Sequence, residues 1–395
     1  MRNVLNPSRP GGVAAGFLAV LAAVTICSQS AKALVFHSTG DPGYNTSAPT
    51  GTYADSGWRF QAEWSYGGAT AISPQHLLTA SHFGGNIVGK NVVFHGSLHQ
   101  ITHYVDDSSS DLRILEVSEP LGAWAPLYSG SSEFGKEIVL HGRGRPRGNE
   151  VTEGGELKGW QWDARDGVQR WGKNEVTDIS TAVNPSLVMQ FDSDGGTNEA
   201  GYSEWDSGSG AFIFNENTGQ YELAGVGYGV DGPYNFQSGD TGAFSGSVFD
   251  EGGLWENQGS WTYHHDTGRD KPQEFHATRV SAQYSWIYDE ISSSLPTAGD
   301  ANLDGIVDFS DAWAVLASYK TDGDYFWFDG DFTHDGIVDE ADVDLLLANY
   351  GAGVAGGLDS STISAMFDQT DGTAVPEPGT LILLGIGSIM FARRK

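Results

Sequence analysis

The sequence predicts an all-β fold followed by a small helical module, and two observations support this prediction. Residues 34–293 contain short apolar runs separated by Gly, Asn, Asp and Ser, a spacing typical of a β-sandwich or β-barrel. After them, an acidic loop motif begins at Asp300 and again at Asp331, and each copy runs into a helical pattern.

The predicted strands are short, and the spacing alone does not choose between a sandwich and a barrel. They cover residues 69–72, 77–78, 91–94, 114–117, 137–140, 187–191, 211–214 and 221–226. One helix is expected late in this region, because Val280, Tyr284, Ile287 and Ile291 recur at helical spacing. We expect this helix to pack its apolar stripe on the strands.

The chain is strongly acidic, with 51 Asp and Glu against 21 Lys and Arg and a formal charge of -30. A nucleic-acid partner requires a basic face, so we expect none. A solvated acidic surface accounts for most of the excess, and the remainder fits carboxylates that bind cations.

Residues 1–33 have the features of an export signal peptide. Arg2 and Arg9 form its positive end, residues 13–26 its apolar run, and Ala31-Lys32-Ala33 its cleavage site. The exported chain therefore starts at Leu34. Cys27, the only cysteine, lies inside this segment, so we expect no disulfide in the exported protein.

The C-terminal residues 374–395 contain a Pro-Glu-Pro motif at 376–378, an apolar run over 381–392 and then Arg393-Arg394-Lys395. This arrangement resembles the PEP-CTERM sorting tail of certain Gram-negative bacteria. The apolar run is short for a spanning helix, which needs about 17–25 residues, and a plain membrane helix does not explain the motif. The resemblance implies transient membrane association through the tail, cleavage by an exosortase-type enzyme, and a final location at the cell surface, exterior or extracellular matrix.

A candidate nucleophile, Ser207, lies in a Gly/Ser-rich turn that leads into an apolar strand. A serine hydroxyl needs a base, and the base needs a carboxylate to orient it. His82 directly follows an apolar strand and Asp111 begins another. Ser209 is an alternative nucleophile with Gly before it, and Asp106 and Asp107 compete with Asp111 without heading a strand; all of these are weaker candidates.

The segments Thr79-Ala80-Ser81-His82, Asp111-Leu112-Arg113-Ile114-Leu115 and Asp206-Ser207-Gly208, in that order, resemble the signatures of the trypsin/chymotrypsin family of serine proteases. Residues 67–72, 223–229 and 278–287 resemble further strands and the C-terminal helix of that family. The resemblance implies a protease domain over 34–293 made of two antiparallel β-barrels. His82 and Asp111 would lie on the first barrel and Ser207 on the second.

The same resemblance implies the roles of the site residues. His82 is the base, Asp111 orients it, Ser207 attacks a peptide carbonyl, and the backbone N–H groups of Trp205 and Ser207 form the oxyanion hole. Trp205 departs from the family, which has Gly at this position because Gly adopts the required backbone conformation at least cost.

Specificity is less well defined by the sequence. Family members that cut after Lys or Arg carry Asp six residues before the nucleophile, and this chain has Gly201 there. We therefore expect no simple trypsin-like preference. The insertion over 232–274 is expected to be a surface loop, with a wall of the substrate cleft as the alternative.

After a linker over 294–299, two twelve-residue loops carry oxygen ligands at positions 1, 3, 5, 9 and 12, a backbone carbonyl at position 7 and Gly at position 6. The predicted ligands are Asp300, Asn302, Asp304, Ile306, Asp308 and Asp311 in the first loop, and Asp331, Thr333, Asp335, Ile337, Asp339 and Asp342 in the second. Such oxygen sets suit calcium. Helices are expected over 312–319 and 343–350, and residues 351–373 are expected to be a flexible linker.

Paired loops that end in Asp and precede one helix resemble dockerin type I modules, which are EF-hand-like. The resemblance implies two structural calcium ions over residues 300–350 and a cohesin-like partner. A calcium-stiffened spacer is the alternative, and the sequence does not separate the two.

Taken together, these features predict an exported serine endopeptidase that acts on a protein or peptide substrate. The competing interpretation is a non-catalytic, surface-displayed binding or scaffolding protein built on a protease fold. A third, membership of a polysaccharide-degrading assembly, has no paired-carboxylate signature to support it.

Overall fold

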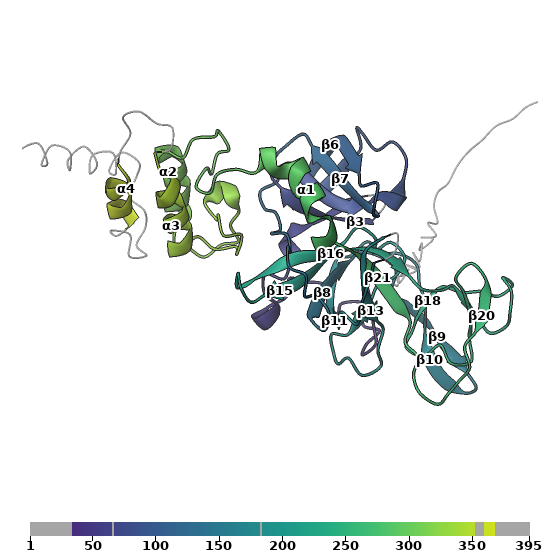
Figure 1. Ribbon diagram of the computed structural model, residues 1–395. Helices are drawn as coiled ribbons and strands as arrows, with labels where there is room; N and C mark the ends of the chain where they lie inside the picture. Colours follow the sequence, from purple (N-terminus) through teal and green to yellow (C-terminus); the bar gives the residue numbers. More distant parts are fainter. Residues whose placement is uncertain (1–33, 65–66, 182–183, 352–358, 368–395) are drawn as a thin grey trace, which may run out of the picture. The chain divides into compact units, whose positions relative to one another are not determined.

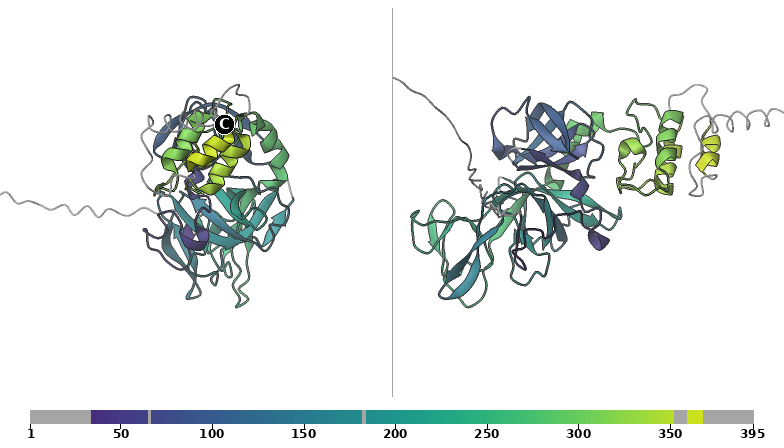
Figure 2. Two further views of the ribbon diagram at one scale, coloured as in Figure 1. Left: turned by 90° about the vertical axis from the view of Figure 1, so that its left-hand side faces the viewer. Right: turned by 180° about the vertical axis from the view of Figure 1, so that it is seen from behind.

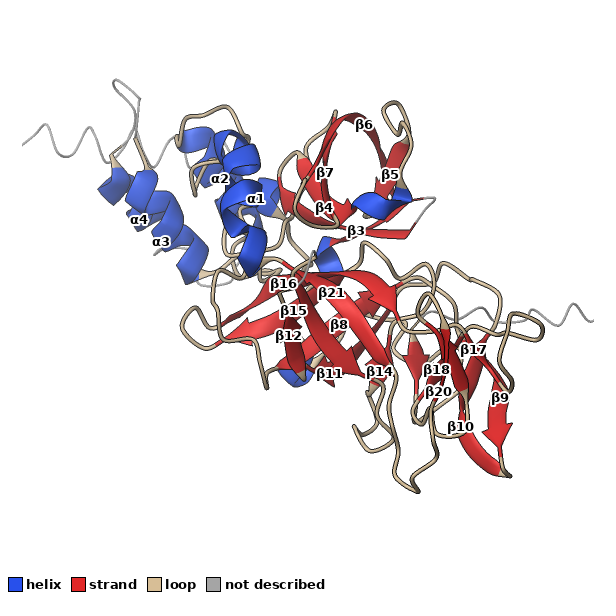
Figure 3. Ribbon diagram, turned by 45° about the vertical axis from the view of Figure 1, so that its right-hand side comes forward, coloured by secondary structure: helices blue, strands red, loops and turns tan. Residues whose placement is uncertain are grey.

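The computed structural model describes residues 34–64, 67–181, 184–351 and 359–367. Strands are the main regular secondary structure of the described chain, and its α-helices all come after residue 283 (Figures 1 and 3). The predicted signal peptide and sorting tail lie outside the described residues. Among the described residues, none of the helices has the length and apolarity needed to cross a membrane.

The first half of the β region is a closed antiparallel barrel whose strands follow the order β2-β3-β4-β7-β6-β5. Its strands are β2 (Gln61–Trp64), β3 (Gly67–Ser73), β4 (His76–Ala80), β5 (Asn91–Phe94), β6 (Ser97–Asp106) and β7 (Leu112–Val117). Every residue of β3 is buried, so this strand forms the wall of the barrel that faces the rest of the fold.

The second half is a seven-stranded antiparallel sheet in the order β11-β8-β15-β16-β21-β13-β12. Its strands are β8 (Glu137–Gly142), β11 (Arg170–Glu175), β12 (Asp178–Ser180), β13 (Ser186–Gln190), β15 (Gly210–Asn215), β16 (Gln220–Val230) and β21 (Glu274–Arg279). The sequence predicted a second barrel, and the sheet is instead open between β11 and β12. The edge strand β12 has only three residues and none is buried, so closing the sheet there would bury little apolar surface.

Each predicted apolar run overlaps a strand of these two sheets, which confirms the prediction of a mostly β fold. The predicted apolar runs missed β2, β6, β11, β12 and β21 of these sheets. In β6 only His99 and Ile101 are buried, and the buried residues of β11 include the polar Arg170 and Asn174, so neither of these two strands has a continuous apolar run.

The β region also contains three small sheets. They pair β1 (Val35–Phe36) with β14 (Ala200–Gly201), then β9 (Arg147–Glu153) and β18 (Gly246–Val248) with β10 (Glu156–Trp162), and finally β17 (Tyr234–Asn235), β19 (Trp255–Asn257) and β20 (Trp261–Tyr263). The insertion over 232–274 is therefore folded into strands.

Helix α1 (Tyr284–Ile291) follows a 3₁₀ turn; Val280, Ile287 and Ile291 are buried, as the helical spacing predicted, whereas Tyr284 is only half-buried. The two repeats each continue into a helix, α2 (Phe309–Ser318) and α3 (Glu340–Asn349). Asp308 and Asp339 cap these helices in reciprocal capping boxes with Asp311 and Asp342, which satisfies the first free N–H groups of each helix.

The predicted flexible linker over 351–373 contains helix α4 (Ser360–Phe367), so that prediction is wrong for this stretch. Ile363, Met366 and Phe367 are buried, and α4 lies beside α3 (Figure 2). Their spacing of three and four residues gives one apolar face, and Asp359 accepts the backbone N–H of Thr362 at the start of the helix, at 2.8 Å.

Candidate active site

His82 and Asp111 are brought together by the pairing of β4 with β7. His82 lies in the 3₁₀ turn Ser81–Phe83 that follows β4, and Asp111 directly precedes β7. Since Ala80 pairs with Leu112, the end of one strand and the start of the other are adjacent. The His82 Nδ1 and Asp111 Oδ2 atoms lie 2.6 Å apart.

The Asp111 carboxylate is held from several sides and is only 15% exposed. Its Oδ1 accepts the His82 backbone N–H and the Ser81 hydroxyl, both at 2.8 Å. The backbone N–H of Asp111 donates to Asn184 Oδ1 at 3.0 Å. Asn184 comes from a distant loop, and no local sequence signal identified it.

The alternative carboxylates, Asp106 and Asp107, form hydrogen bonds with other side chains. Asp106 pairs with Arg113, whose Nη2 donates to Asp106 Oδ2 at 2.8 Å. Asp107 accepts the hydroxyl groups of Ser109 and Ser110. Neither Asp106 nor Asp107 contacts the His82 ring through a hydrogen bond within the described residues.

Ser207 lies in the turn before β15, next to the barrel strand β3. Its backbone oxygen accepts the Gly68 N–H at 2.9 Å. A Cβ atom on Gly67 would lie 2.5 Å from this Ser207 oxygen and 2.7 Å from the Phe83 ring, so a glycine at 67 lets the serine turn approach the turn that carries His82. Across the described part of the chain, no hydrogen bond links Ser207 Oγ to His82.

Ser209, the alternative nucleophile, is only 2% exposed. A Cβ atom on Gly68 would lie 2.1 Å from its hydroxyl oxygen, so Ser209 is packed tightly against β3. A substrate cannot reach it in this conformation.

The serine turn is fixed by Asp206, which is fully buried. Its carboxylate accepts the Gly144 N–H at 2.6 Å and both the N–H and the hydroxyl of Ser203 at 2.8 Å. Burial raises the pKa of Asp206 to about 6, against the opposing effect of these hydrogen bonds. The sequence showed an acidic residue before Ser207 but not this anchoring.

Trp205 adopts the left-handed backbone conformation, with φ of 80°. The Glu204 carbonyl oxygen accepts the Arg145 N–H at 3.0 Å. Because a trans peptide points its C=O and N–H in opposite directions, the Trp205 N–H points away from Arg145.

Some backbone N–H groups of this turn are paired within the protein. Asp206 N donates to Ser203 O at 3.1 Å and Gly208 N to Gly227 O at 2.8 Å. Among the described residues, no acceptor is found for the N–H groups of Glu204, Trp205 and Ser207. The last two are the groups that the sequence predicted as an oxyanion hole.

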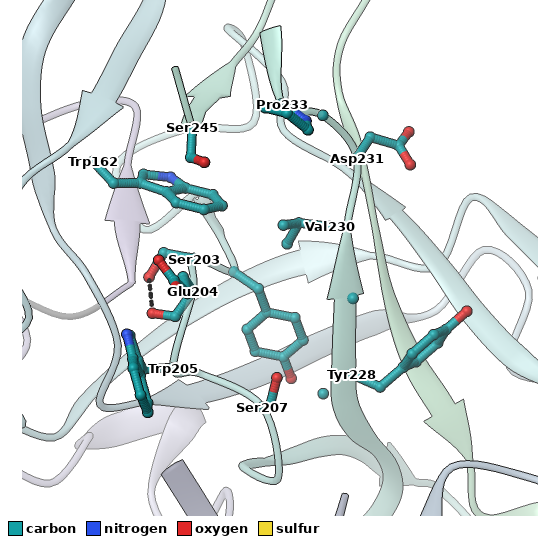
Figure 4. Close-up of a pocket in the computed structure, with 14 residues that line it drawn as sticks. Trp162, Ser203, Glu204, Trp205, Ser207, Tyr228, Val230, Asp231, Pro233 and Ser245 are labelled. Carbon is teal, nitrogen blue, oxygen red and sulfur yellow. Dashed lines mark hydrogen bonds between the residues drawn. The ribbon is translucent and has the colours of Figure 1, made fainter. Parts of the chain in front are cut away.

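A cavity of about 330 Å³ opens beside Ser207. In Figure 4, Trp162 and Ser245 lie on one side, Val230 opposite them, and Ser207 and Trp205 toward one end. Ser245 and Pro233 belong to the insertion over 232–274, so this insertion forms part of the wall, as the alternative interpretation expected.

The two acidic loops share most of the hydrogen bonds that their first and last carboxylates accept. The first carboxylate of each loop, Asp300 or Asp331, accepts the N–H groups of positions 5 and 6 at 2.9–3.1 Å. The last carboxylate, Asp311 or Asp342, accepts the N–H of position 9 at 2.8 and 3.0 Å. All four carboxylates are almost fully buried.

This donor set fits a hard cation. Gly305 and Gly336 at position 6 have φ of 85° and 88°, which gives the sharp bend that such a loop requires. Buried carboxylates gathered within twelve residues repel one another unless a cation neutralises them.

The comparisons with known proteins identify the C-terminal motif. Residues 374–395 match the model of the PEP-CTERM protein-sorting motif. This motif indicates an exported, cell-surface protein of Gram-negative bacteria that is anchored in the membrane before an exosortase-type enzyme processes it.

No curated protein matches the chain. Among solved structures, the chain is similar to neuropsin, a serine protease expressed in the limbic system of mouse brain, with a TM-score of 0.39 and 12% identity. The match covers 60% of this chain and 96% of that one.

Proposed function

We propose that the protein is an exported serine endopeptidase of the chymotrypsin type, with His82, Asp111 and Ser207 as its catalytic triad. The observation that carries this proposal is the 2.6 Å contact between His82 Nδ1 and Asp111 Oδ2. A carboxylate at that distance keeps the proton on Nδ1 and leaves Nε2 as the base.

In the proposed reaction, Ser207 Oγ attacks the carbonyl carbon of a peptide bond while His82 Nε2 takes its proton. His82 then gives this proton to the leaving amine, and the acyl group remains on Ser207. Water, activated by His82 in the same way, releases the acid product and restores the serine.

The negative oxygen of the intermediate is stabilised by the free N–H groups of Trp205 and Ser207. Each such donor contributes about 10²–10³ to the rate in serine proteases. Their lack of a partner within the described chain supports this role.

The test is labelling of the full-length protein, exported by an expression host, with a fluorophosphonate probe. We expect labelling of the wild type and none of Ser207→Ala or His82→Ala, with Ser209→Ala as the matched control that stays labelled. Circular dichroism would establish that the variants are folded. An unlabelled, folded wild type would contradict the proposal.

That last result would favour the second candidate function, a non-catalytic binding protein displayed at the cell surface. The observation in its favour is the left-handed Trp205. A non-glycine residue there costs about 1–3 kcal/mol, and a rotated 204–205 peptide would relieve the strain and remove the oxyanion donor.

We also propose that the two acidic loops each hold a structural calcium ion through the side chains and backbone carbonyls of the twelve predicted ligands. The burial of four carboxylates and the matching loop geometry support this. Calcium would supply positive charge to these carboxylates, of which only Asp331 has a basic partner, Arg59, among the described residues. Isothermal titration calorimetry would then give two ions per chain, and Asp300→Asn and Asp331→Asn would each lose one.

A further inference from the structure

The second acidic loop packs against the first barrel. The Trp124 ring, from the chain that follows the barrel strands, lies 4.7 Å from the Trp327 ring and 4.5 Å from the His334 ring. The backbone N–H of Trp327 donates to the Gly122 carbonyl at 2.8 Å. Buried residues of the barrel and of the repeats therefore belong to a single apolar core.

Arg59 lies at the centre of this contact. It precedes β2 in the barrel and is only 8% exposed. Its Nη1 donates to Asp331 Oδ2 at 2.9 Å, and its Nη2 donates to the Tyr325 carbonyl. The guanidinium carbon also lies 5.1 Å from the Phe326 ring centroid.

The partners of this guanidinium come from the repeat region, so the charge is buried only when the repeats are docked. A buried guanidinium without such partners is costly. The Arg59 contacts therefore add a specific polar interaction between the barrel and this segment to the burial of aromatic surface.

The Arg59 contact distinguishes the two loops. Asp300 and Asp331 accept the same backbone N–H groups within their own loops. Of the two, only Asp331 pairs with a basic side chain among the described residues. Arg59 and Gly336 share Asp331 Oδ2, while Oδ1 is contacted only from within its own loop.

We propose that the second loop is a calcium-dependent clamp on the protein's own first barrel, with Arg59 as its anchor. Calcium holds the loop in the conformation in which Asp331 Oδ2 accepts the hydrogen bond from Arg59. The docking partner of this face is thus the same chain, and a cohesin-like protein would have to use another face of the module. This inference rests on the proposed calcium binding and does not depend on the peptidase activity.

The first experiment measures docking directly by electron paramagnetic resonance. Two spin labels are placed on the full-length chain, carrying Cys27→Ser, at Leu98→Cys on β6 and Ala348→Cys on α3, both exposed positions. With calcium, we expect one narrow distance distribution. Removing calcium with EGTA should broaden it, as should Asp331→Asn or Arg59→Gln.

Asp300→Asn is the matched control, because it removes the first ion but no barrel contact; its distance distribution should stay narrow. Phe326→Ala is a second interface variant that changes no charge, and it should broaden the distribution in a folded module. Docking and ion binding at one loop are reciprocal. Phe326→Ala should therefore also lower the calcium affinity of the second loop about five-fold or more, as measured by calorimetry.

A narrow distribution that survives EGTA or Arg59→Gln would overturn the clamp. So would calorimetry that finds no ion lost in Asp331→Asn, which would also refute calcium binding at the second loop. Fluorophosphonate labelling of the same samples separates the two proposals, because calcium-dependent docking without labelling would refute only the peptidase.

Discussion

Replacing Asp111 by Asn tests the proposed base most directly. The Asp111 carboxylate accepts three hydrogen bonds, two at Oδ1 and one at Oδ2. In the Asn variant, the amide oxygen can keep the two bonds to Ser81 and the His82 N–H. The amide NH₂ then faces His82 Nδ1, which must become an acceptor.

An imidazole that accepts at Nδ1 carries its proton on Nε2, so it cannot take the proton of Ser207. The equivalent loss in proteases with this triad is about 10⁴-fold in kcat. At about 1.4 kcal/mol per tenfold, this corresponds to about 5.5 kcal/mol of transition-state stabilisation. Stability should change little, because both Oδ1 contacts persist.

The assay is cleavage of an unfolded protein substrate together with the rate of fluorophosphonate labelling, and thermal unfolding monitors the fold. Asp106→Asn is the matched control: it weakens the pair with Arg113 and should leave cleavage within a few-fold of the wild type. A loss below tenfold in a folded Asp111→Asn protein would refute the assignment of His82 and Asp111.

Three further predictions concern the surroundings of the site. Trp205→Gly should relieve the strain of the left-handed residue and raise stability by about 1 kcal/mol with little change in the labelling rate; slower labelling of a folded variant would mean that the indole itself is needed. Burial raises the pKa of Glu199 to about 8, so the stability that its protonated form provides is complete below about pH 4.5 and is lost as the pH rises through 8. Glu199→Gln, which keeps an acceptor for Asn174, should therefore become more stable than the wild type as the pH rises, and urea midpoints at pH 5, 7 and 9 that stay parallel would contradict this. Lys158 is 1% exposed and its Nζ lies 2.5 Å from Asp250, so Lys158→Ala should cost about 3–5 kcal/mol in urea unfolding; a loss below 1 kcal/mol would show that the pair adds little.

The sequence predicted the elements that have a periodic apolar pattern. The runs that became β3, β4 and β15 are buried almost throughout, and the stripe of α1 has helical spacing. The open edge of the second sheet was not predictable, because closure depends on how distant strands meet and not on any one of them.

Local motifs identified the candidate site residues in the sequence, whereas the contacts that support these residues have no local signal. His82, Asp111 and the serine turn each lie in a recognisable segment. The Asn184 side chain contacts Asp111, and the Arg145 backbone N–H contacts Glu204. In both pairs the two residues are more than fifty positions apart in the sequence. A backbone contact leaves no signature in the residue type, so no feature of the sequence indicated it.

Trp205 shows how such supports change the interpretation of a motif. In the sequence it is a departure that weakens the proposed oxyanion hole, because a non-glycine residue in this conformation costs about 1–3 kcal/mol. In the structure, the Arg145 N–H donates to the Glu204 carbonyl, and the Asp206 carboxylate accepts three hydrogen bonds from Gly144 and Ser203.

Each of these bonds contributes about 0.5–1.5 kcal/mol net, and those to a charged carboxylate contribute more. Together they equal or exceed the strain, so the turn keeps the Trp205 N–H free without requiring glycine. The departure then affects the stability of the turn and not its geometry. The comparison of Trp205→Gly with the wild type measures that difference, because a geometric defect would be repaired by a large gain in labelling rate, whereas strain alone would appear mainly as a gain in stability.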